Sequence, residues 1–346
     1  MNASKHHRPP PQNVIPFADS CSPYYALVPP EIRHEIFSYA LSDFPDPSAN
    51  SRYNSQTCYT RPSYFASRKS DLRLLRTCRA VYREAWFLPF TKRTQTFWLC
   101  TVGEDRAPPG HWASAHRRRC GRILSQITAE YGGRRVEIEK LHVFAQMYKI
   151  ENGELCHVLR TPHLHPRSFT LTVRHTDWWW WEHDQGLYFE AKWIPELCLF
   201  LSSSVKEIRI QLESLERKKG QVDAIVKHMS EHWYFKRSDN EVLYPDATLQ
   251  MVEVSRWTGS STWHGNTWTR DEARPGEVDY YVAEVVFRPR HVLERLGGHV
   301  SVVATENAKR GVFDEAAMRC RATENEGQTD QSQESAQILV DTQDMS

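Results

Sequence analysis

Two amphipathic segments near the beginning of the chain most constrain how it can fold. In the first, the prolines at positions 29 and 30 fix the entry backbone, and Glu31 complements the positive end of a helix dipole. Apolar residues then recur at helical spacing, namely Ile32, Ile36, Phe37, Ala40 and Leu41. This pattern predicts a helix with one apolar face.

The second segment begins at Ser70 or Asp71, either of which can cap a helix, and ends at Pro89, which is expected to stop it. Its apolar stripe consists of Leu74, Cys78, Val81 and Ala85, widened by Leu75 and Tyr82. Between the two segments, residues 42–69 are polar and interrupted by prolines. We therefore expect two helices that frame a loop longer than compact domains usually contain.

After residue 94 the chain turns to short segments rich in β-branched and aromatic residues, which are typical of strands. Strands are expected at residues 94–102, 140–147, 168–174, 187–193, 206–212, 248–257 and 278–287, and further helices at 113–129 and 222–233. The predicted fold class is α+β, with helices at the start and a strand-rich mixed sheet with covering helices after them. Polar composition predicts a disordered arm over residues 1–23 and a disordered acidic tail over residues 298–346.

The composition excludes several classes of protein. The 346 residues are 40% hydrophobic and 25% charged, which is typical of a folded chain. Lys and Arg total 44 against 43 for Asp and Glu, so the global basic excess of a dedicated nucleic-acid binder is missing. There is no apolar run of membrane-spanning length, no secretory signal and no dense cysteine framework among the eight cysteines. We expect reduced thiols and an intracellular location, in the cytoplasm or nucleus.

Residues 27–41, LVPPEIRHEIFSYAL, and 72–90, LRLLRTCRAVYREAWFLPF, carry a family resemblance. Together with TQTFW at 94–98, they resemble fungal F-box-like proteins of unknown function, whose pattern is LPPEIR, LLxTCRxxYxEAxxxxF and NTFxF. The resemblance implies an F-box-like helical module at residues 24–102, with a long insertion at 42–69, and an α+β domain of unknown function at 103–297.

In F-box proteins these helices dock onto a Skp-type adaptor of a cullin-RING ubiquitin ligase, while the C-terminal part holds a substrate. The resemblance therefore implies an adaptor-facing surface, formed here by Leu27, Pro29, Ile32, Ile36, Leu72 and Leu75. The alternative is that the same apolar stripes simply pack as core against the following sheet.

The sharpest enzymatic pattern is HMSEH, in which His228, Glu231 and His232 match the HxxEH motif of inverted zinc peptidases on an expected helix. Histidines four residues apart share a helix face and could bind one zinc ion, with the glutamate as general base. A third ligand would have to come from a downstream residue such as Glu284 or Glu306. The alternative is an ordinary surface helix.

Other clusters of polar residues match known metal or acid-base sites less closely. Cys156, His157, His163 and His165 match no established zinc spacing, and His175, Asp177, His183 and Asp184 surround the four tryptophans at 178–181. The tryptophan segments, which include Trp257, Trp263 and Trp268, could stack bases or sugars, and the basic clusters at 117–122 and 217–219 could bind phosphates. GxSxG, Walker and GxGxxG motifs are absent from the sequence.

The sequence thus predicts a non-enzymatic protein-protein interaction protein, without catalytic residues, metal or cofactor, which is an adaptor for ubiquitin-ligase substrates if the resemblance holds. The alternatives are a zinc hydrolase using residues 228–232 and an RNA or carbohydrate binder using the tryptophan segments. The oligomeric state is left open.

Overall fold

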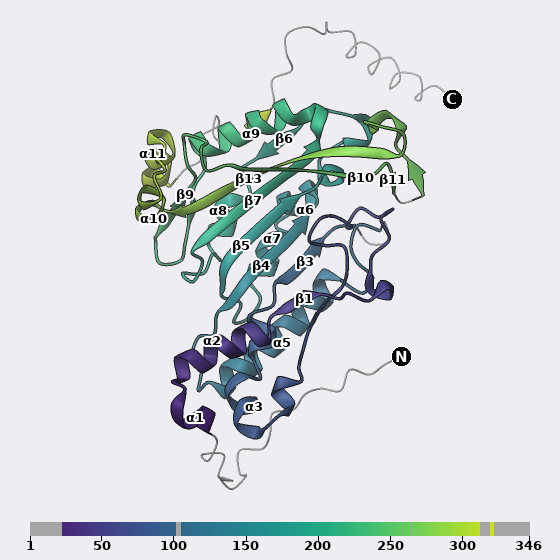
Figure 1. Cartoon of the computed structure of the whole chain (residues 1–346). Helices are drawn as coiled ribbons and strands as arrows, with labels where there is room; N and C mark the ends of the chain where they lie inside the picture. Colours follow the sequence, from purple (N-terminus) through teal and green to yellow (C-terminus); the bar gives the residue numbers. More distant parts are fainter. Residues whose placement is uncertain (1–22, 102–104, 264, 312–318, 322–346) are drawn as a thin grey trace, which may run out of the picture. The chain divides into compact units, whose positions relative to one another are not determined.

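The computed structural model describes residues 23–101, 105–263, 265–311 and 319–321, and these fall into two compact units (Figure 1). Unit 1 contains the described residues up to Arg52 together with Ala66–Thr94, and unit 2 contains Tyr53–Phe65 and the described residues from Gln95 onward. This division differs from the expected boundary at residue 102, because the chain crosses between the units three times. Apart from Pro23, the expected N-terminal arm lies outside the described residues.

Unit 1 begins with two helices, α1 (Pro23–Leu27) and α2 (Pro30–Ala40). Helix α2 confirms the first amphipathic segment, with proline and Glu31 in its first turn. The second segment is wrong as a single helix. It is divided into η3 (Leu74–Arg76), α3 (Arg79–Ala85) and α4 (Leu88–Thr91).

Local side-chain bonds explain why this segment breaks. The Asp71 carboxylate accepts a hydrogen bond from the backbone N–H of Arg73 at 2.9 Å, and the Thr77 hydroxyl donates to the Leu74 carbonyl at 2.8 Å. The Asp71 bond caps the first turn, as the sequence predicts, whereas the Thr77 bond competes with helical bonds just before the break. Cys78 is extended, with φ −155° and ψ 165°, and is exposed rather than part of an apolar stripe. Pro89 does not stop a helix but lies in the first turn of α4, where its missing N–H costs nothing.

The helices of unit 1 share one core. Its buried members are Phe37, Leu41, Val81, Ala85 and Leu88, and partly buried Leu74 and Leu75 pack against them. The two amphipathic segments are therefore paired, although each contributes fewer buried residues than its periodicity predicts.

The long insertion is not a single loop. Its ends form a small antiparallel pair in unit 1, β1 (Asp43–Pro45) and β2 (Arg68–Ser70), with η2 (Ala49–Ser51) after the first strand. Its middle, Tyr53–Phe65, belongs to unit 2. We call this stretch the crossing segment.

Unit 2 is built on an eight-stranded mixed sheet with the order β3-β4-β5-β7-β13-β9-β8, and β10 pairs with β13 (Figure 1). The strands are β3 (Gln95–Leu99), β4 (Ile138–Ala145), β5 (Pro166–Val173), β7 (Glu207–Leu215), β8 (Phe235–Lys236), β9 (Val242–Tyr244), β10 (Glu253–Ser260) and β13 (Glu277–Pro289). The first four strands are parallel to one another, and the remaining pairings are antiparallel. The predicted α+β class is confirmed.

Helices connect the parallel strands, as parallel pairing requires. They are α5 (Ala113–Glu130), α6 (Met147–Glu151), α7 (Glu154–Leu159) and α8 (Ile194–Cys198), and α9 (Lys219–His232) follows β7. Helix α9 packs against β7 and β13 through Val222, Ile225, Val226 and Met229. The expected helices at 113–129 and 222–233 are thereby confirmed. None of the described helices is both long and apolar enough to cross a membrane.

The two faces of the sheet differ in chemistry because successive side chains of a strand point to opposite faces. One face is apolar, and its central members are Leu141, Val143, Phe169, Leu171, Ile208, Ile210 and Leu212, all fully buried. The other carries His142, Thr172, Gln211 and Glu284 on four successive strands, with the aromatic residues Trp98 and Phe144 on the same side of β3 and β4. We call the second the polar face.

The prediction of a disordered tail over residues 298–346 is wrong for the part that the structure describes. Helix α11 (Val302–Arg310) lies within it, next to α9, and strand β14 (Arg319–Arg321) pairs with β6 (Tyr188–Glu190). Ser301 caps α11 by accepting from the N–H groups of Val303 and Ala304, and its hydroxyl donates to the Glu231 carbonyl of α9 at 2.6 Å. The orphan carbonyl at the end of one helix is thus satisfied by the cap of another.

We expect Ser301→Ala to lower the free energy of unfolding by about 1–2 kcal/mol, because it removes a helix cap and a bond to α9. Chemical denaturation measures this, with Val302→Ala as the matched control, since Val302 is 78% exposed on the same helix. Equal denaturation midpoints for the two variants would show that Ser301 does not join α11 to α9.

Candidate functional site

The residues of the predicted adaptor-facing surface differ in exposure. Leu27, Pro29, Ile32, Ile36 and Leu72 are exposed, with Ile32 at 50% and Ile36 at 45%. Leu75 is partly buried against the core of unit 1. Five of the six therefore present apolar surface that unit 1 does not bury.

Helix α2 carries two neighbouring apolar stripes, of which one is buried and the other is exposed. Phe37 and Leu41 point into the core, whereas Ile32, Ile36 and Tyr39 lie along the exposed side. Tyr39 is 76% exposed and was missed by the sequence analysis, although it lies seven residues after Ile32 and hence on the same side of the helix. The exposed stripe is therefore continuous over two helical turns.

Arg33 anchors this helix within unit 1. Its Nε lies 3.1 Å from Glu84 Oε1 of α3, its Nη1 donates to the Val28 carbonyl at 2.7 Å, and its guanidinium lies 4.7 Å from the centre of the Tyr25 ring. One side chain thus ties together α1, α2 and α3. The exposed stripe is consequently carried on a fixed frame.

The HxxEH residues lie on α9 as expected, and the rings of His228 and His232 stack with centroids 4.6 Å apart. Glu231 lies 3.9 Å from Lys227 of the same helix. Neither expected third ligand joins them, because Glu284 pairs with Arg209 on the sheet and Glu306 with Lys309 on α11. Within the described part of the chain, no three His, Cys, Asp or Glu residues come together in a way that could hold a metal ion.

Several residues of the remaining histidine and cysteine clusters are buried or bonded to neighbouring side chains. Cys156 is buried in α7, and burial raises the pKa of its thiol to about 11. His165 Nδ1 lies 3.0 Å from the Ser202 hydroxyl. Asp177 forms an ion pair with Arg174, and Asp184 forms one with Arg217.

Most of the tryptophans contribute to packing. Trp178, Trp181 and Trp263 are buried, and the rings of Trp181 and Trp268 lie 4.5 Å apart. Trp180 alone of the four consecutive tryptophans is classed as exposed, at 57%. The four consecutive tryptophans therefore do not all enter one core.

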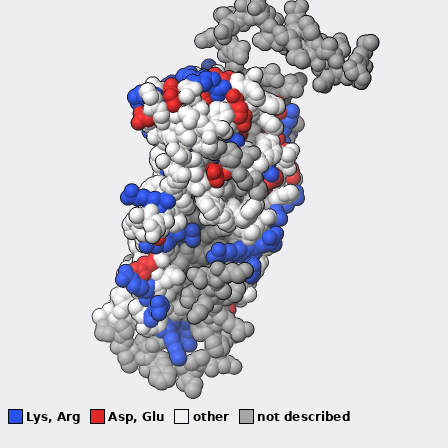
Figure 2. Space-filling model, turned by 90° about the vertical axis from the view of Figure 1, so that its right-hand side faces the viewer, with Lys and Arg blue, Asp and Glu red and all other residues white. Residues whose placement is uncertain are grey.

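The basic cluster at 217–219 is largely neutralised by its neighbours. Arg217 pairs with Asp184 and Asp271, and Lys218 is buried and lies 2.8 Å from Asp184. Figure 2 shows blue and red side chains side by side over the upper part of the face it presents. Charges that are already paired offer little free energy to a phosphate.

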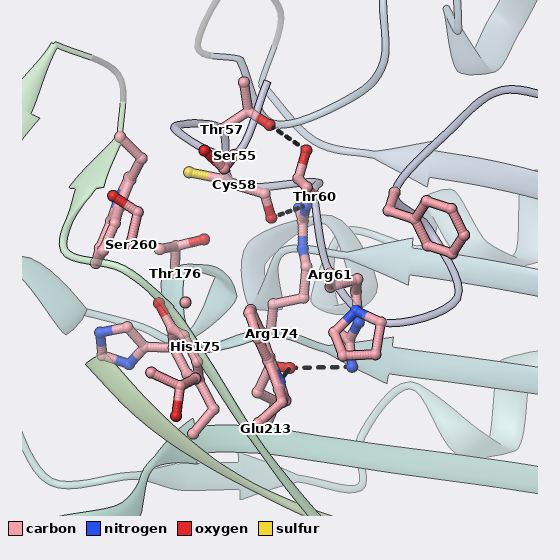
Figure 3. Close-up of a pocket in the computed structure, with 17 residues that line it drawn as sticks. Ser55, Thr57, Cys58, Thr60, Arg61, Arg174, His175, Thr176, Glu213 and Ser260 are labelled. Atoms are coloured by element: carbon pink, nitrogen blue, oxygen red, sulfur yellow. Dashed lines mark hydrogen bonds and ion pairs between the residues drawn. The ribbon is translucent and has the colours of Figure 1, made fainter. Parts of the chain in front are cut away.

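The structure shows one feature that the sequence analysis missed, a cavity of about 290 Å³ in unit 2 (Figure 3). One wall is the crossing segment, with Thr57, Cys58, Thr60 and Arg61. The opposite walls come from the end of β5 and from β7, β10 and β13, and include Arg174, His175, Glu213, Trp257 and Tyr280. The cavity adjoins the carboxyl ends of parallel strands, where open sheets of this kind commonly bind ligands.

Two buried ion pairs organise the cavity. Arg61 Nη2 lies 3.0 Å from Glu213 Oε2, and Arg174 Nε lies 2.6 Å from Asp177 Oδ2 (Figure 3 shows the first). Burial by itself would lower the pKa of Arg174, but Asp177 raises it, so this side chain stays cationic. Burial raises the pKa of the Cys58 thiol, which disfavours a thiolate nucleophile here.

A chain of hydrogen bonds crosses the polar face next to the cavity. Gln211 Nε2 donates to Glu284 at 2.6 Å, and the Thr172 hydroxyl donates to Gln211 Oε1 at 2.7 Å. Since the Thr172 proton is used, its oxygen accepts from His142 Nε2 at 2.8 Å, which leaves His142 Nδ1 to accept from the Tyr64 hydroxyl at 2.6 Å. The chain thereby fixes the tautomer of His142 and joins the crossing segment to the sheet.

The sequence held little signal for these residues. Arg61 lies in a polar stretch without periodicity, and Glu213 and Arg174 lie at the ends of predicted strands where charged residues are common. Only the crossing of the chain into unit 2 brings Arg61 to Glu213, and no local pattern encodes that.

The chain was compared with family models, curated proteins and solved structures, and none of them matches it.

Burial, and to a smaller degree the charge of Arg61, lowers the pKa of His142 to about 3. In the unfolded chain the pKa returns to about 6.5, so the unfolded state binds more protons as the pH falls from about 6.5 towards 3. The stability that neutral His142 contributes to the folded state is fully present above pH 6.5 and is lost as the pH falls from about 6.5 towards 3. We expect His142→Gln to reduce the loss between about pH 6.5 and 5 by roughly 1–2 kcal/mol, measured by chemical denaturation.

Tyr64→Phe serves as the matched variant. It keeps the imidazole but removes the donor to Nδ1, which makes protonation of that nitrogen easier, so its pH dependence should lie between those of wild type and His142→Gln. If both variants lose stability with pH as steeply as wild type, His142 is not held neutral by this chain.

Proposed function

We propose that the chain is a non-enzymatic docking protein whose unit 1 binds a Skp-type adaptor of a cullin-RING ubiquitin ligase. The exposed stripe of α2, with Ile32 and Ile36 at its centre, is the observation that carries the proposal. Leu27, Pro29 and Leu72 extend the surface, and Leu75 supports it from the core. The partner is taken from the F-box-like resemblance of residues 27–41 and 72–90.

Exposed isoleucines at helical spacing favour a protein partner over solvent. Complete burial of an isoleucine side chain contributes roughly 1.5–3 kcal/mol, so two that are about half exposed leave roughly 2 kcal/mol unused. A fixed amphipathic helix loses little conformational entropy when its free side enters a groove. The anchoring of α2 by Arg33 supplies that rigidity.

Under this proposal unit 2 is the part that holds a substrate or a second partner. Its cavity, lined by charged, polar and aromatic side chains, gives it a chemistry distinct from the apolar stripe of unit 1. The rival zinc hydrolase gains no support from the described residues, since His228 and His232 have no third ligand beside them.

Co-expression of the full chain with a fungal Skp-type adaptor tests the proposal. We expect the adaptor to co-purify with wild type and to be lost from the double variant Ile32→Asp, Ile36→Asp. Two carboxylates in an apolar interface cost several kcal/mol, which corresponds to at least about a 100-fold loss of affinity.

His34→Asp is the matched control, because His34 is exposed on α2 about half a turn from Ile32. It should retain the adaptor, and thermal unfolding should show that all variants are folded. Absence of the adaptor from the wild-type complex, or equal binding by the double variant, would contradict the proposal.

A further inference from the structure

Trp257 forms a fixed, flat wall of the cavity in unit 2. Its ring stacks on Tyr280 with centroids 4.2 Å apart and planes at 21°, and its Nε1 donates to Glu213 Oε2 at 2.9 Å. Gly259 allows this stack, because a Cβ there would lie 2.7 Å from the Trp257 ring and 3.1 Å from the Tyr280 ring. The indole is therefore held before any ligand arrives.

Hydrogen-bonding groups beside this wall are left unused. The contacts of Glu213 with Arg61 and with Trp257 both end on Oε2, and no hydrogen bond from the described residues reaches Oε1. Among the lining residues, the buried polar atoms without a hydrogen-bond partner in the described part of the chain are Arg61 Nη1, Trp263 Nε1, Thr176 Oγ1 and both ring nitrogens of His175. Buried polar groups are rarely left unpaired, so the acceptor of Glu213 and the donor of the adjacent Arg61, which line the same cavity, point to a guest that satisfies them.

Charge and size restrict what this guest can be. The pairs Arg61–Glu213 and Arg174–Asp177 each cancel, so these groups leave no net charge to attract an anion, and a phosphate would lie against the Glu213 carboxylate. The cavity of about 290 Å³ is at the small end of ligand pockets, with room for one ring.

We propose that the cavity binds an uncharged single-ring ligand that presents a hydrogen-bond donor beside an acceptor on one edge. The ring packs against Trp257, Glu213 Oε1 accepts from the ligand, and Arg61 Nη1 donates to it. A pyranose with neighbouring hydroxyls and a nucleobase with an amide edge share this chemistry. The site is independent of the docking surface of unit 1.

The crossing segment responds to such a ligand. Arg61 belongs to this segment, whereas Glu213 belongs to β7, so a ligand bonded to both restrains the segment against the sheet. Besides its direct effect on Trp257 fluorescence, binding should therefore slow hydrogen exchange at the backbone amides of residues 57–61.

Titration of the full chain with two sets of compounds, followed by tryptophan fluorescence and calorimetry, tests the proposal. One arm contains the methyl glycosides of glucose, galactose, mannose and N-acetylglucosamine, and the other contains uracil, cytosine and adenine. At concentrations up to about 10 mM, dissociation constants in the millimolar range are measurable. We expect saturable binding in one arm, which identifies the source, and none with inorganic phosphate.

Glu213→Gln should weaken binding by about 10-fold or more, because it replaces a charged acceptor but keeps the shape and the bond to Trp257. Arg61→Gln should weaken it similarly and is a second, independent variant, and thermal unfolding of both variants shows whether they are folded. Glu216→Gln is the matched control, since Glu216 is partly exposed and pairs with Arg256. It should bind as wild type does.

Three results would overturn the proposal. They are the absence of saturable binding in both arms, phosphate binding in preference to them, and binding that survives both Glu213→Gln and Arg61→Gln in folded protein. The last would place the compounds elsewhere on the chain, and the second would make the cavity an anion site.

Discussion

The organisation of unit 2 depends on the interactions of one buried group, the guanidinium of Arg174. It pairs with Asp177, donates to the backbone carbonyls of Cys58 and Arg106 at 3.0 and 2.8 Å, and lies 5.3 Å from the centre of the Trp98 ring. A buried charge that loses its partners costs several kcal/mol. The crossing segment, the residues around Arg106 and the end of β5 must therefore be in place together.

This constraint explains why the middle of the insertion belongs to the sheet domain rather than to the helices beside it in sequence. The face beneath the crossing segment has an aromatic part, in which the rings of Trp98 and Phe144 stack with centroids 4.1 Å apart, and a polar part, in which His142, Thr172, Gln211 and Glu284 bond to one another. The crossing segment matches both parts, because Tyr59 packs edge-on against Trp98, Tyr64 bonds to His142 and Arg61 pairs with Glu213.

The spacing of apolar residues predicted the helices and strands whose buried side follows from their own sequence. Helices α2, α5 and α9 and strands β4, β5, β7 and β13 all follow from the spacing of their apolar residues, and so does the α+β class. The break at Cys78 did not follow, because the hydroxyl of Thr77 bonds to the Leu74 carbonyl, a local competitor of helical bonds that the spacing of apolar residues does not show. Helix α11 was missed because its polar composition resembles a tail, whereas its order depends on Ser301 and the distant end of α9. The candidate cavity could not be predicted, since Arg61 and Glu213 are joined only through the path of the chain.

The path of the chain also determines which experiments can distinguish the two proposed binding sites. Unit 2 includes Tyr53–Phe65, which is flanked in the sequence by residues of unit 1, so a truncation at residue 94 would remove the Arg61 ion pair of Glu213 and the Cys58 carbonyl that accepts from Arg174. The cost of those lost partners would fall on the folding of unit 2 itself and not on a detachable module. Point substitutions in the full chain, rather than isolated domains, are therefore the means of distinguishing a docking role of unit 1 from ligand binding in unit 2, because Ile32 and Ile36 belong to unit 1 and Glu213 belongs to unit 2.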